Sequence, residues 1–163
     1  MTSLSIVPIG VGDLPFVRQM LYEAAFWRDP SDAPSLDTAL REPELAVYVQ
    51  GWGRPGDDGL VARVGGRPVG AVWVRCFDAE AHGYGYVDEL TPELSVAVVQ
   101  GQRGLGLGRS LVTAMLTQLR LHGTRQVSLS VETDNPARSL YGRLGFVTTG
   151  GSDGAVTMVR TLP

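Results

Sequence analysis

The stretch best able to do chemistry comprises residues 103–109, which read Arg-Gly-Leu-Gly-Leu-Gly-Arg. Glycines have no side chain, so the backbone N–H groups beside them stay accessible to a ligand. The helical pattern that starts at Gly108 adds the unpaired N–H donors and the positive dipole end of a first helical turn. Arg103 and Arg109 add permanent positive charge on both sides. These residues predict an anion site that fits a pyrophosphate group.

Two familiar phosphate-binding motifs do not match this stretch. A Rossmann dinucleotide site has the spacing G-x-G-x-x-G in the first strand-to-helix crossover, whereas these glycines follow G-x-G-x-G, with about a hundred residues before them. A P-loop requires a lysine, and all 14 basic residues of the chain are arginine. The lack of lysine also excludes Schiff-base chemistry. The sequence therefore argues against both motifs.

The elements that must position the glycine stretch are a strand before it and a helix after it. Residues 93–99 predict the strand. From Gly108, apolar residues recur at helical spacing until Gly123, which is a typical stop. Residues 127–132 then alternate between apolar and polar, as in a half-buried strand. Such a unit places its two strands parallel, with a right-handed connection.

A second helix is predicted directly after this unit. Asn135 is a favoured cap, Pro136 occupies the tolerated first position, and Gly145 is a C-terminal cap. The remaining pattern predicts strands at 4–8, 60–64, 69–77, 146–149 and 155–162, a helix beginning near residue 14, a short helix from 35 that Pro43 interrupts, and loops at 51–59 and 78–91. The strands at 60–64 and 69–77 are expected to form an antiparallel hairpin. We expect one domain over residues 1–163.

Composition excludes several classes of protein. A net charge of −3 leaves no basic surface for nucleic acid, and no apolar run is long enough for a membrane span. The N-terminus lacks the features of a signal peptide, so we expect a cytosolic protein. His82 and His122 lie far apart without ligand spacing, so no metal site is expected. Cys76, in an apolar run, is interpreted as a buried strand cysteine.

The same part of the sequence resembles the GNAT superfamily of acetyl-CoA-dependent N-acetyltransferases. Its motif (Q/R)-x-x-G-x-(G/A) is matched by Arg103, Gly106 and Gly108. Residues 96–98, Val-Ala-Val, are similar to the end of the family's fourth strand. Residues 135–146 are similar to the family pattern N-x-x-A-x-x-L-Y-x-x-x-G-F. The resemblance covers residues 93–146, whereas the N-terminal third carries no comparable motif.

The resemblance implies an α/β (α+β) fold with a mixed, mostly antiparallel sheet flanked by helices, in which parallel fourth and fifth strands splay apart. A pantetheine arm would enter the gap and pair with the exposed edge of residues 96–98. A backbone N–H near Val98 would polarise the thioester carbonyl. Tyr141 matches the family tyrosine near the sulfur, where it would donate a proton to the leaving thiolate. The residues expected to bind acetyl-CoA are Val96, Ala97, Val98, Arg103, Gly104, Leu105, Gly106, Leu107, Gly108, Arg109, Asn135 and Tyr141.

Two assignments stay open at this point. Five residues separate Asn135 from Tyr141 where the family commonly has six, so Asp134 is an alternative for the asparagine position. The second open assignment is the general base. A protonated amine must lose a proton before or during its attack, which calls for a carboxylate, directly or through water. Glu93 is the first candidate because family members often have a catalytic glutamate at the start of the fourth strand; the further candidates are Glu132, then Asp88 and Glu89.

No motif in the sequence identifies the acceptor. Trp73 is expected in the core, whereas Trp27, Trp52, Tyr84 and Tyr86 are candidates for an aromatic acceptor pocket. The favoured reading is an acetyltransferase that moves an acetyl group to an amine of a small molecule or peptide by direct attack. The alternative is a non-catalytic acyl-CoA sensor or scaffold. The oligomeric state is left open, a homodimer included.

Overall fold

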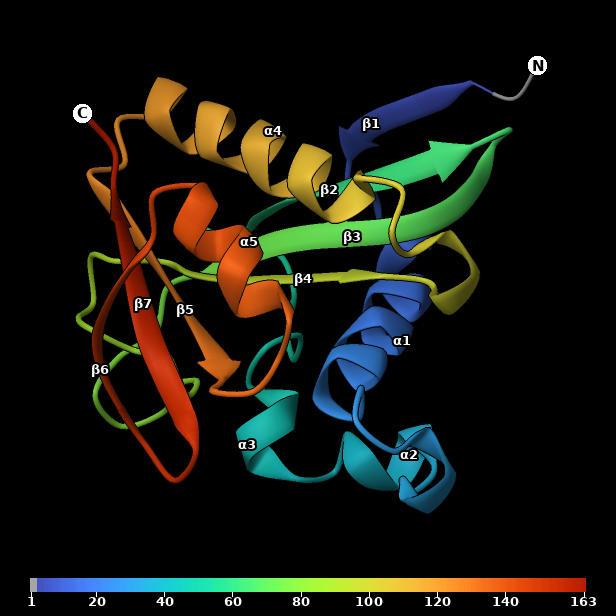
Figure 1. Ribbon diagram of the computed structural model, residues 1–163, viewed down its shortest axis with the longest axis horizontal. Helices are drawn as coiled ribbons and strands as arrows, with labels where there is room; N and C mark the ends of the chain where they lie inside the picture. Colours follow the sequence, from blue (N-terminus) through green and yellow to red (C-terminus); the bar gives the residue numbers. More distant parts are fainter. Residues whose placement is uncertain (1–2) are drawn as a thin grey trace.

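The computed structural model describes residues 3–163 and contains one seven-stranded sheet in the order β1-β2-β3-β4-β5-β7-β6 (Figure 1). All neighbouring strands pair antiparallel except β4 and β5, which are parallel. The strands are β1 (Leu4–Pro8), β2 (Asp58–Val64), β3 (Arg67–Arg75), β4 (Glu93–Val98), β5 (Gln126–Glu132), β6 (Val147–Ser152) and β7 (Ala155–Thr161). The helices are α1 (Leu14–Ala25), α2 (Leu36–Ala39), α3 (Pro43–Ala46), α4 (Leu107–Leu121) and α5 (Ala137–Arg143), with short 3₁₀ turns at Val11–Asp13, Pro30–Asp32 and Gln100–Gln102.

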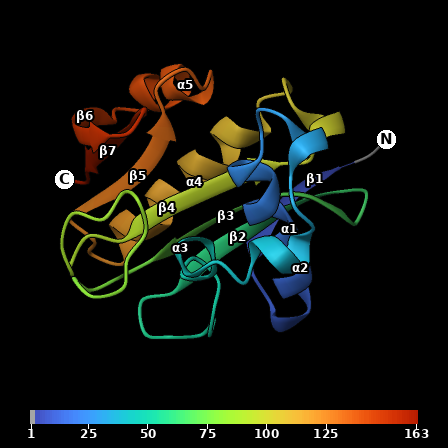
Figure 2. The same ribbon diagram turned by 90° about the horizontal axis from the view of Figure 1, so that it is seen from below.

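Helices cover both faces of the sheet (Figure 2). On one face, Leu111 and Met115 of α4 pack in a core with Val72 of β3 and with residues of β5 and α5. On the other face, Met20 of α1 packs in a second core with Trp73 of β3. Successive residues of a strand point to opposite faces, so β3 contributes to both cores and reads as a nearly continuous apolar run.

The fold agrees with the expected mixed, mostly antiparallel sheet with a parallel β4–β5 pair. The hairpin of β2 and β3 is antiparallel, as predicted. The strand β4 runs opposite β3 in an unbroken register from Gly70↔Val98 to Arg75↔Glu93. The strand β5 has only one register partner on β4, at Glu93↔Ser128. Beyond this pair the two strands diverge.

The short helix predicted from residue 35 is present as α2, which Ser35 caps and which ends before Pro43; a separate short helix, α3, begins at Pro43. Proline is tolerated there since the first N–H of a helix has no intrahelical acceptor to lose. Cys76 is not a buried strand residue: β3 ends at Arg75, and the cysteine is partly exposed. The last β3 residue with a β2 partner is Val74, opposite Asp58, so nothing extends the hairpin as far as Cys76.

Candidate active site

The glycine stretch forms the tight turn that precedes α4. Gly104 and Gly106 have φ values of 78° and 82°, in the left-handed region that favours glycine. None of the backbone N–H groups from Gly104 to Arg109 donates a hydrogen bond to another described residue; the first to do so is that of Ser110, to Gly106 O at 3.0 Å. A row of unpaired donors therefore meets the positive end of the α4 dipole, as the anion prediction requires.

The two arginines beside this turn have different surroundings. Arg103 folds back along the turn, and its Nε donates to Val98 O at 3.0 Å. Its Nη2 lies 3.9 Å from Glu23 of α1. Arg103 therefore ties the turn to the end of β4. Arg109 is exposed in the first turn of α4 and has no ion-pair partner among residues 3–163, so its charge is available to an anion.

The divergence of β4 and β5 leaves an unpaired edge on β4. Val99 N donates a hydrogen bond of 2.8 Å to Val69 O of β3. Because backbone groups alternate in direction along a strand, those of Val98 and Val96 point the other way, towards the gap. Arg103 Nε, which binds Val98 O, occupies the end of this edge. The edge of residues 96–98 therefore has the direction expected for pairing with an extended amide-containing ligand.

Tyr141 lies in α5 on the side of the sheet that α4 covers. Its side chain is buried, with 9% of the residue exposed, and its ring is 6.0 Å from that of Phe146 in an edge-on arrangement. Burial raises the pKa of Tyr141 to about 12. Its hydroxyl bonds to no described residue and is not among the fully enclosed polar atoms. The phenol thus stays protonated at neutral pH and has an unused donor.

Asn135 acts as the local cap that the sequence predicts. Its Oδ1 accepts a hydrogen bond of 2.9 Å from the N–H of Ala137, at the start of α5. Asp134 does not share this role, because its carboxylate binds Arg28 with an N–O distance of 2.6 Å. Asn135 also borders a cavity on the face of the sheet that α1 covers, opposite α4 and α5.

This cavity, which we call the acceptor cavity, has a volume of about 860 Å³. Its wall comes from α1–α3, from the neighbouring strands β4 and β5, and from the β6–β7 turn. Figure 1 shows how these elements are arranged. Ser95 and Ser130 form part of its wall at the splayed strands. Its remaining polar wall is rich in carboxylates, and its aromatic wall includes two candidates from the sequence. The acidic residues are Glu42, Glu44, Glu132 and Asp153, and the aromatic residues are Phe26, Trp27, Tyr48 and Tyr84.

The other aromatic candidates lie outside this cavity. Trp73 is fully buried in the core, as predicted. Trp52 packs against the core of the α1 face, with the guanidinium of Arg75 5.5 Å from its ring centre. Tyr86 stacks on His82 at 4.4 Å. Of the four aromatic residues predicted for an acceptor pocket, the structure therefore brings only Trp27 and Tyr84 to the acceptor cavity.

Glu93, the first-ranked base candidate, is 3% exposed. Its Oε2 accepts a hydrogen bond of 2.5 Å from the hydroxyl of Tyr48, whereas Oε1 has no hydrogen-bond partner among the described residues. Burial raises the pKa of Glu93 to about 7, although the Tyr48 hydroxyl and the nearby Gly85 amide act in the opposite direction. A carboxylate with this pKa can accept a proton at neutral pH and release it again.

The other carboxylate candidates lie in three different environments. Glu132 borders the acceptor cavity but forms an ion pair of 2.5 Å with Arg28. Asp88 accepts hydrogen bonds of 2.9 Å from Leu90 N and from Thr91 Oγ1. Glu89 is exposed in the loop before β4. Glu93 and Glu132 therefore lie on the face of the sheet that borders the acceptor cavity, while Asp88 and Glu89 do not line that cavity.

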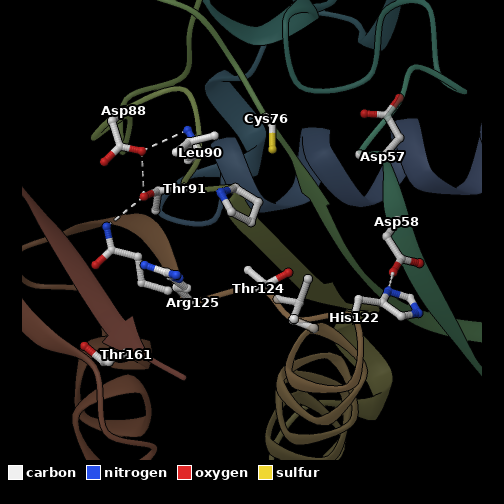
Figure 3. A pocket seen from close by; sticks show the side chains of 15 residues that line it. Asp57, Asp58, Cys76, Asp88, Leu90, Thr91, His122, Thr124, Arg125 and Thr161 are labelled. Atoms are coloured by element: carbon white, nitrogen blue, oxygen red, sulfur yellow. Dashed lines mark hydrogen bonds and ion pairs between the residues drawn. The ribbon is translucent and has the colours of Figure 1, made fainter. Parts of the chain in front are cut away.

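A second cavity, of about 880 Å³, lies at the far end of α4 (Figure 3). It includes Cys76 and Asp88, and its acidic groups have partners within the protein: Asp58, for example, is 3.4 Å from His122. The 15 residues of α4 separate this cavity from the glycine turn by about 22 Å at 1.5 Å per residue. It is therefore distinct from the site at the β4–β5 gap.

Sequence reasoning missed Tyr48 and Arg75. Arg75 is 1% exposed and binds Asp57 through two hydrogen bonds, of 2.9 and 2.8 Å. An arginine within an apolar strand is a signal for a buried partner, because an unpaired charge is very costly in a core. Tyr48 has no such signal, since no motif surrounds it. Among residues 3–163, no group of three or more His, Cys, Asp or Glu side chains is arranged to hold a metal ion, and no helix is long and apolar enough to cross a membrane.

The same fold occurs in solved structures of acetyltransferases. The PaiA N-acetyltransferase of Thermoplasma acidophilum, solved in complex with coenzyme A, superposes with a TM-score of 0.73 over 98% of this chain and 99% of that one, at 15% identity. YncA of Salmonella typhimurium, described as a putative acetyltransferase with its cofactor acetyl-CoA, gives a TM-score of 0.70 at 20% identity, over 99% and 95% of the two chains.

Sequence comparison gives the family. The model of the Acetyltransferase (GNAT) family matches residues 18–146, and the chain belongs to this family. The mycothiol acetyltransferase of Corynebacterium glutamicum (strain R) is 44% identical over 72 residues, which are 41% of this chain and 25% of that protein. That of Geodermatophilus obscurus is 40% identical over 116 residues, 68% of this chain and 33% of that protein. The chain thus spans about a quarter to a third of the length of these relatives.

Proposed function

We propose that this chain transfers an acetyl group from acetyl-CoA to an amine of a small molecule or peptide. The observation that carries the proposal is the row of unpaired N–H groups from Gly104 to Arg109, beside the edge that β4 leaves free. These donors suit the pyrophosphate of coenzyme A, and Arg109 adds charge at the same place. The edge of residues 96–98 suits the amides of pantetheine.

Acetyl-CoA supplies an acetyl group that its thioester activates for transfer. The backbone N–H of Val98 points into the gap, where it can stabilise negative charge on the acetyl oxygen. Tyr141 keeps its phenol protonated at neutral pH, and in this proposal it gives a hydrogen bond or proton to the departing thiol. Val98 and Tyr141 are themselves buried, so little reorganisation accompanies the reaction.

The amine enters from the acceptor cavity, on the opposite side of the gap. Its nitrogen attacks the acetyl carbon, the carbon–sulfur bond breaks, and the nitrogen loses a proton. Glu93 receives this proton, because its pKa of about 7 matches the operating pH of a general base at neutrality. No covalent acetyl-enzyme is required. Cys76, the single thiol of the chain, borders the second cavity instead of this one.

The acceptor named for the mycothiol acetyltransferases is not assigned to this chain, which spans only a fraction of their length. The wall of the acceptor cavity favours a cationic amine by charge alone, through Glu42, Glu44 and Asp153. A cytosolic location and the oligomeric state remain predictions. Cell fractionation and the hydrodynamic size of the purified protein would test them.

The test is a screen for acceptor-dependent release of coenzyme A. Purified protein is mixed with acetyl-CoA and, separately, with amino acid amides, peptides with free N-termini, amino sugars, diamines and aromatic amines. Free thiol is measured with a disulfide reagent, and the acetylated amine is identified by mass. The proposal predicts release that requires both protein and acceptor. Tight binding of acetyl-CoA with no release for any acceptor would instead favour the non-catalytic sensor or scaffold.

A further inference from the structure

The proposed base does not itself reach the acceptor cavity. Glu93 is not among the residues that border the cavity, whereas Tyr48 is. The hydroxyl of Tyr48 donates to Glu93 Oε2 at 2.5 Å and accepts a hydrogen bond of 2.8 Å from Tyr84 N. A phenol oxygen has two lone pairs, so one acceptor position remains after the bond from Tyr84. Tyr48 therefore connects the cavity to the buried carboxylate.

The strand β3 fixes the position of Tyr48 through its backbone. The indole Nε1 of Trp73 donates to Tyr48 O at 3.1 Å. The Nη1 of Arg75 donates to Val47 O at 3.0 Å and to Gln50 O at 2.6 Å, on either side of the tyrosine. These carbonyls follow the end of α3, where backbone acceptors lack intrahelical partners. The segment that carries Tyr48 is thus held to the rigid centre of the sheet.

The charged and titratable groups around Glu93 leave Tyr48 as its main hydrogen-bonding partner. Arg75, its register partner on β3, directs its guanidinium to Asp57. Ser128, its register partner on β5, has a buried hydroxyl with no partner among the described residues. In the loop before β4, His82 lowers the pKa of Glu93 to a smaller extent than Tyr48 does. The Tyr48 hydroxyl is the one side-chain hydrogen-bond donor to the Glu93 carboxylate among residues 3–163.

We propose that Tyr48 is a catalytic residue that carries the proton of the acceptor amine to Glu93. The ammonium or attacking amine donates a hydrogen bond to the free lone pair of Tyr48 Oη. As the N–H bond breaks, this proton joins Tyr48 Oη, and the proton previously on Tyr48 moves to Glu93 Oε2. The phenol is unchanged after the step, the amine has lost one proton, and Glu93 has gained one. This role rests on the proposed acetyl transfer.

The activity test compares two kinds of acceptor in the Tyr48→Phe variant. With a strongly basic primary amine, which is protonated at neutral pH, the variant should lose about a hundredfold in kcat/KM, in the range that general-base catalysis contributes. With an aromatic amine, which is already neutral, the loss should be less than about tenfold. A purely structural role for Tyr48 would lower both rates by the same factor, and that result would overturn the proposal.

A second readout needs neither acetyl-CoA nor an acceptor. The carboxyl carbon of Glu93 is followed against pH by NMR in protein labelled with ¹³C-glutamate, with Glu93→Gln to assign the signal. A hydrogen bond from Tyr48 favours the charged carboxylate, so Tyr48→Phe should raise the Glu93 pKa above that of the wild type. An unchanged titration would show that the two groups are not coupled and would contradict the relay.

A matched control removes a hydroxyl elsewhere. Thr117→Val deletes the hydroxyl that donates to Thr113 O at 3.1 Å on the exposed face of α4, and both acceptor rates should stay near wild type. Tyr48→Phe retains the ring that packs edge-on against Phe77 at 5.8 Å, so the variant should fold. If the wild type itself acetylates no amine, the proposed function fails. If the wild type is active and Tyr48→Phe equals it on the basic amine, only the relay fails.

Discussion

Glu93 and Ser128 form the one register pair that joins β4 to β5 among residues 3–163. Ser128 N donates to Pro92 O at 3.0 Å, which fixes the two strands at this end. Because no ladder continues beyond the pair, the edge of β4 at residues 96–98 is left free towards the gap. The same pair buries the carboxylate of Glu93 beside the divergence point. One contact therefore positions both the free strand edge and the proposed base.

Gly106→Asp should abolish measurable binding of coenzyme A. An added Cβ at this position meets no heavy atom within 4 Å, so the effect should come from negative charge and a side chain in the anion site. Gly106→Asn is the matched control, since asparagine has the same shape without charge and also tolerates a φ of 82°. Calorimetry should detect binding by the Asn variant and none by the Asp variant. Equal affinities for all three proteins would refute the pyrophosphate site.

Tyr141→Phe should reduce turnover while leaving the affinity for acetyl-CoA nearly unchanged. The substitution keeps the ring beside Phe146 and removes only the hydroxyl, which bonds to no described residue. We expect kcat to fall by about a hundredfold, at the low end of the range for a lost general acid. Steady-state rates together with equilibrium binding check this. A variant with wild-type kcat would remove Tyr141 from the chemistry.

Glu93→Gln should make the protein more stable at alkaline pH. A folded-state pKa of about 7, above the ordinary value of 4.5, means that the folded protein holds this proton more tightly than the unfolded chain does. The free energy of unfolding therefore falls as pH rises from about 4.5 to about 7, by roughly 3 kcal/mol if this group acts alone.

Glutamine cannot ionise, yet its carbonyl can still accept the hydrogen bond from Tyr48. The gain in unfolding free energy from Glu93→Gln should be largest above about pH 7 and small near about pH 5. Urea denaturation across this range measures it. A constant difference between the wild type and Glu93→Gln at every pH would contradict the raised pKa.

Asp57→Ala should destabilise the fold. Through Arg75, it should also disturb the acceptor cavity. The side chains of Arg75 and Asp57 are 1% and 2% exposed, so removal of Asp57 leaves a buried guanidinium without its counter-charge. Loss of one partner of such a pair costs about 3 to 5 kcal/mol. Urea denaturation should report this loss. Arg63→Ala, which breaks a more exposed pair with Asp13, should cost less; the reverse order would contradict the role assigned to Arg75.

Local patterns in the sequence predicted the C-terminal half of the site. The glycine spacing at 104–108, the helical repeat of α4 and the cap at Asn135 each depend on residues that are close in the chain. The alternation in β5 likewise separates Ser128 and Ser130 from the core residues between them. These features need no long-range contact to be recognised, and the structure places them as expected.

The acceptor side could not be predicted in the same way. Tyr48 becomes important only because Trp73 and Arg75, on a distant strand, hold its backbone in place. Its partner Glu93 is separated from it by 45 residues. The single β4–β5 pair that sets the gap is also a tertiary feature. Sequence periodicity does not reveal contacts between distant parts of the chain. For this reason four carboxylates remained as candidates for the base.

The most direct test of acetyl transfer is a single-turnover experiment with acetyl-CoA carrying an isotopic label in its acetyl group. Protein in excess is mixed with labelled acetyl-CoA and an amine that is active in the acceptor screen, and the reaction is stopped at successive times. We expect the label to pass from the thioester to the amide product and never to accumulate on the protein, and we expect Gly106→Asp to be inactive. Bound acetyl-CoA that yields no labelled amide, or label that resides first on the protein, would contradict direct transfer.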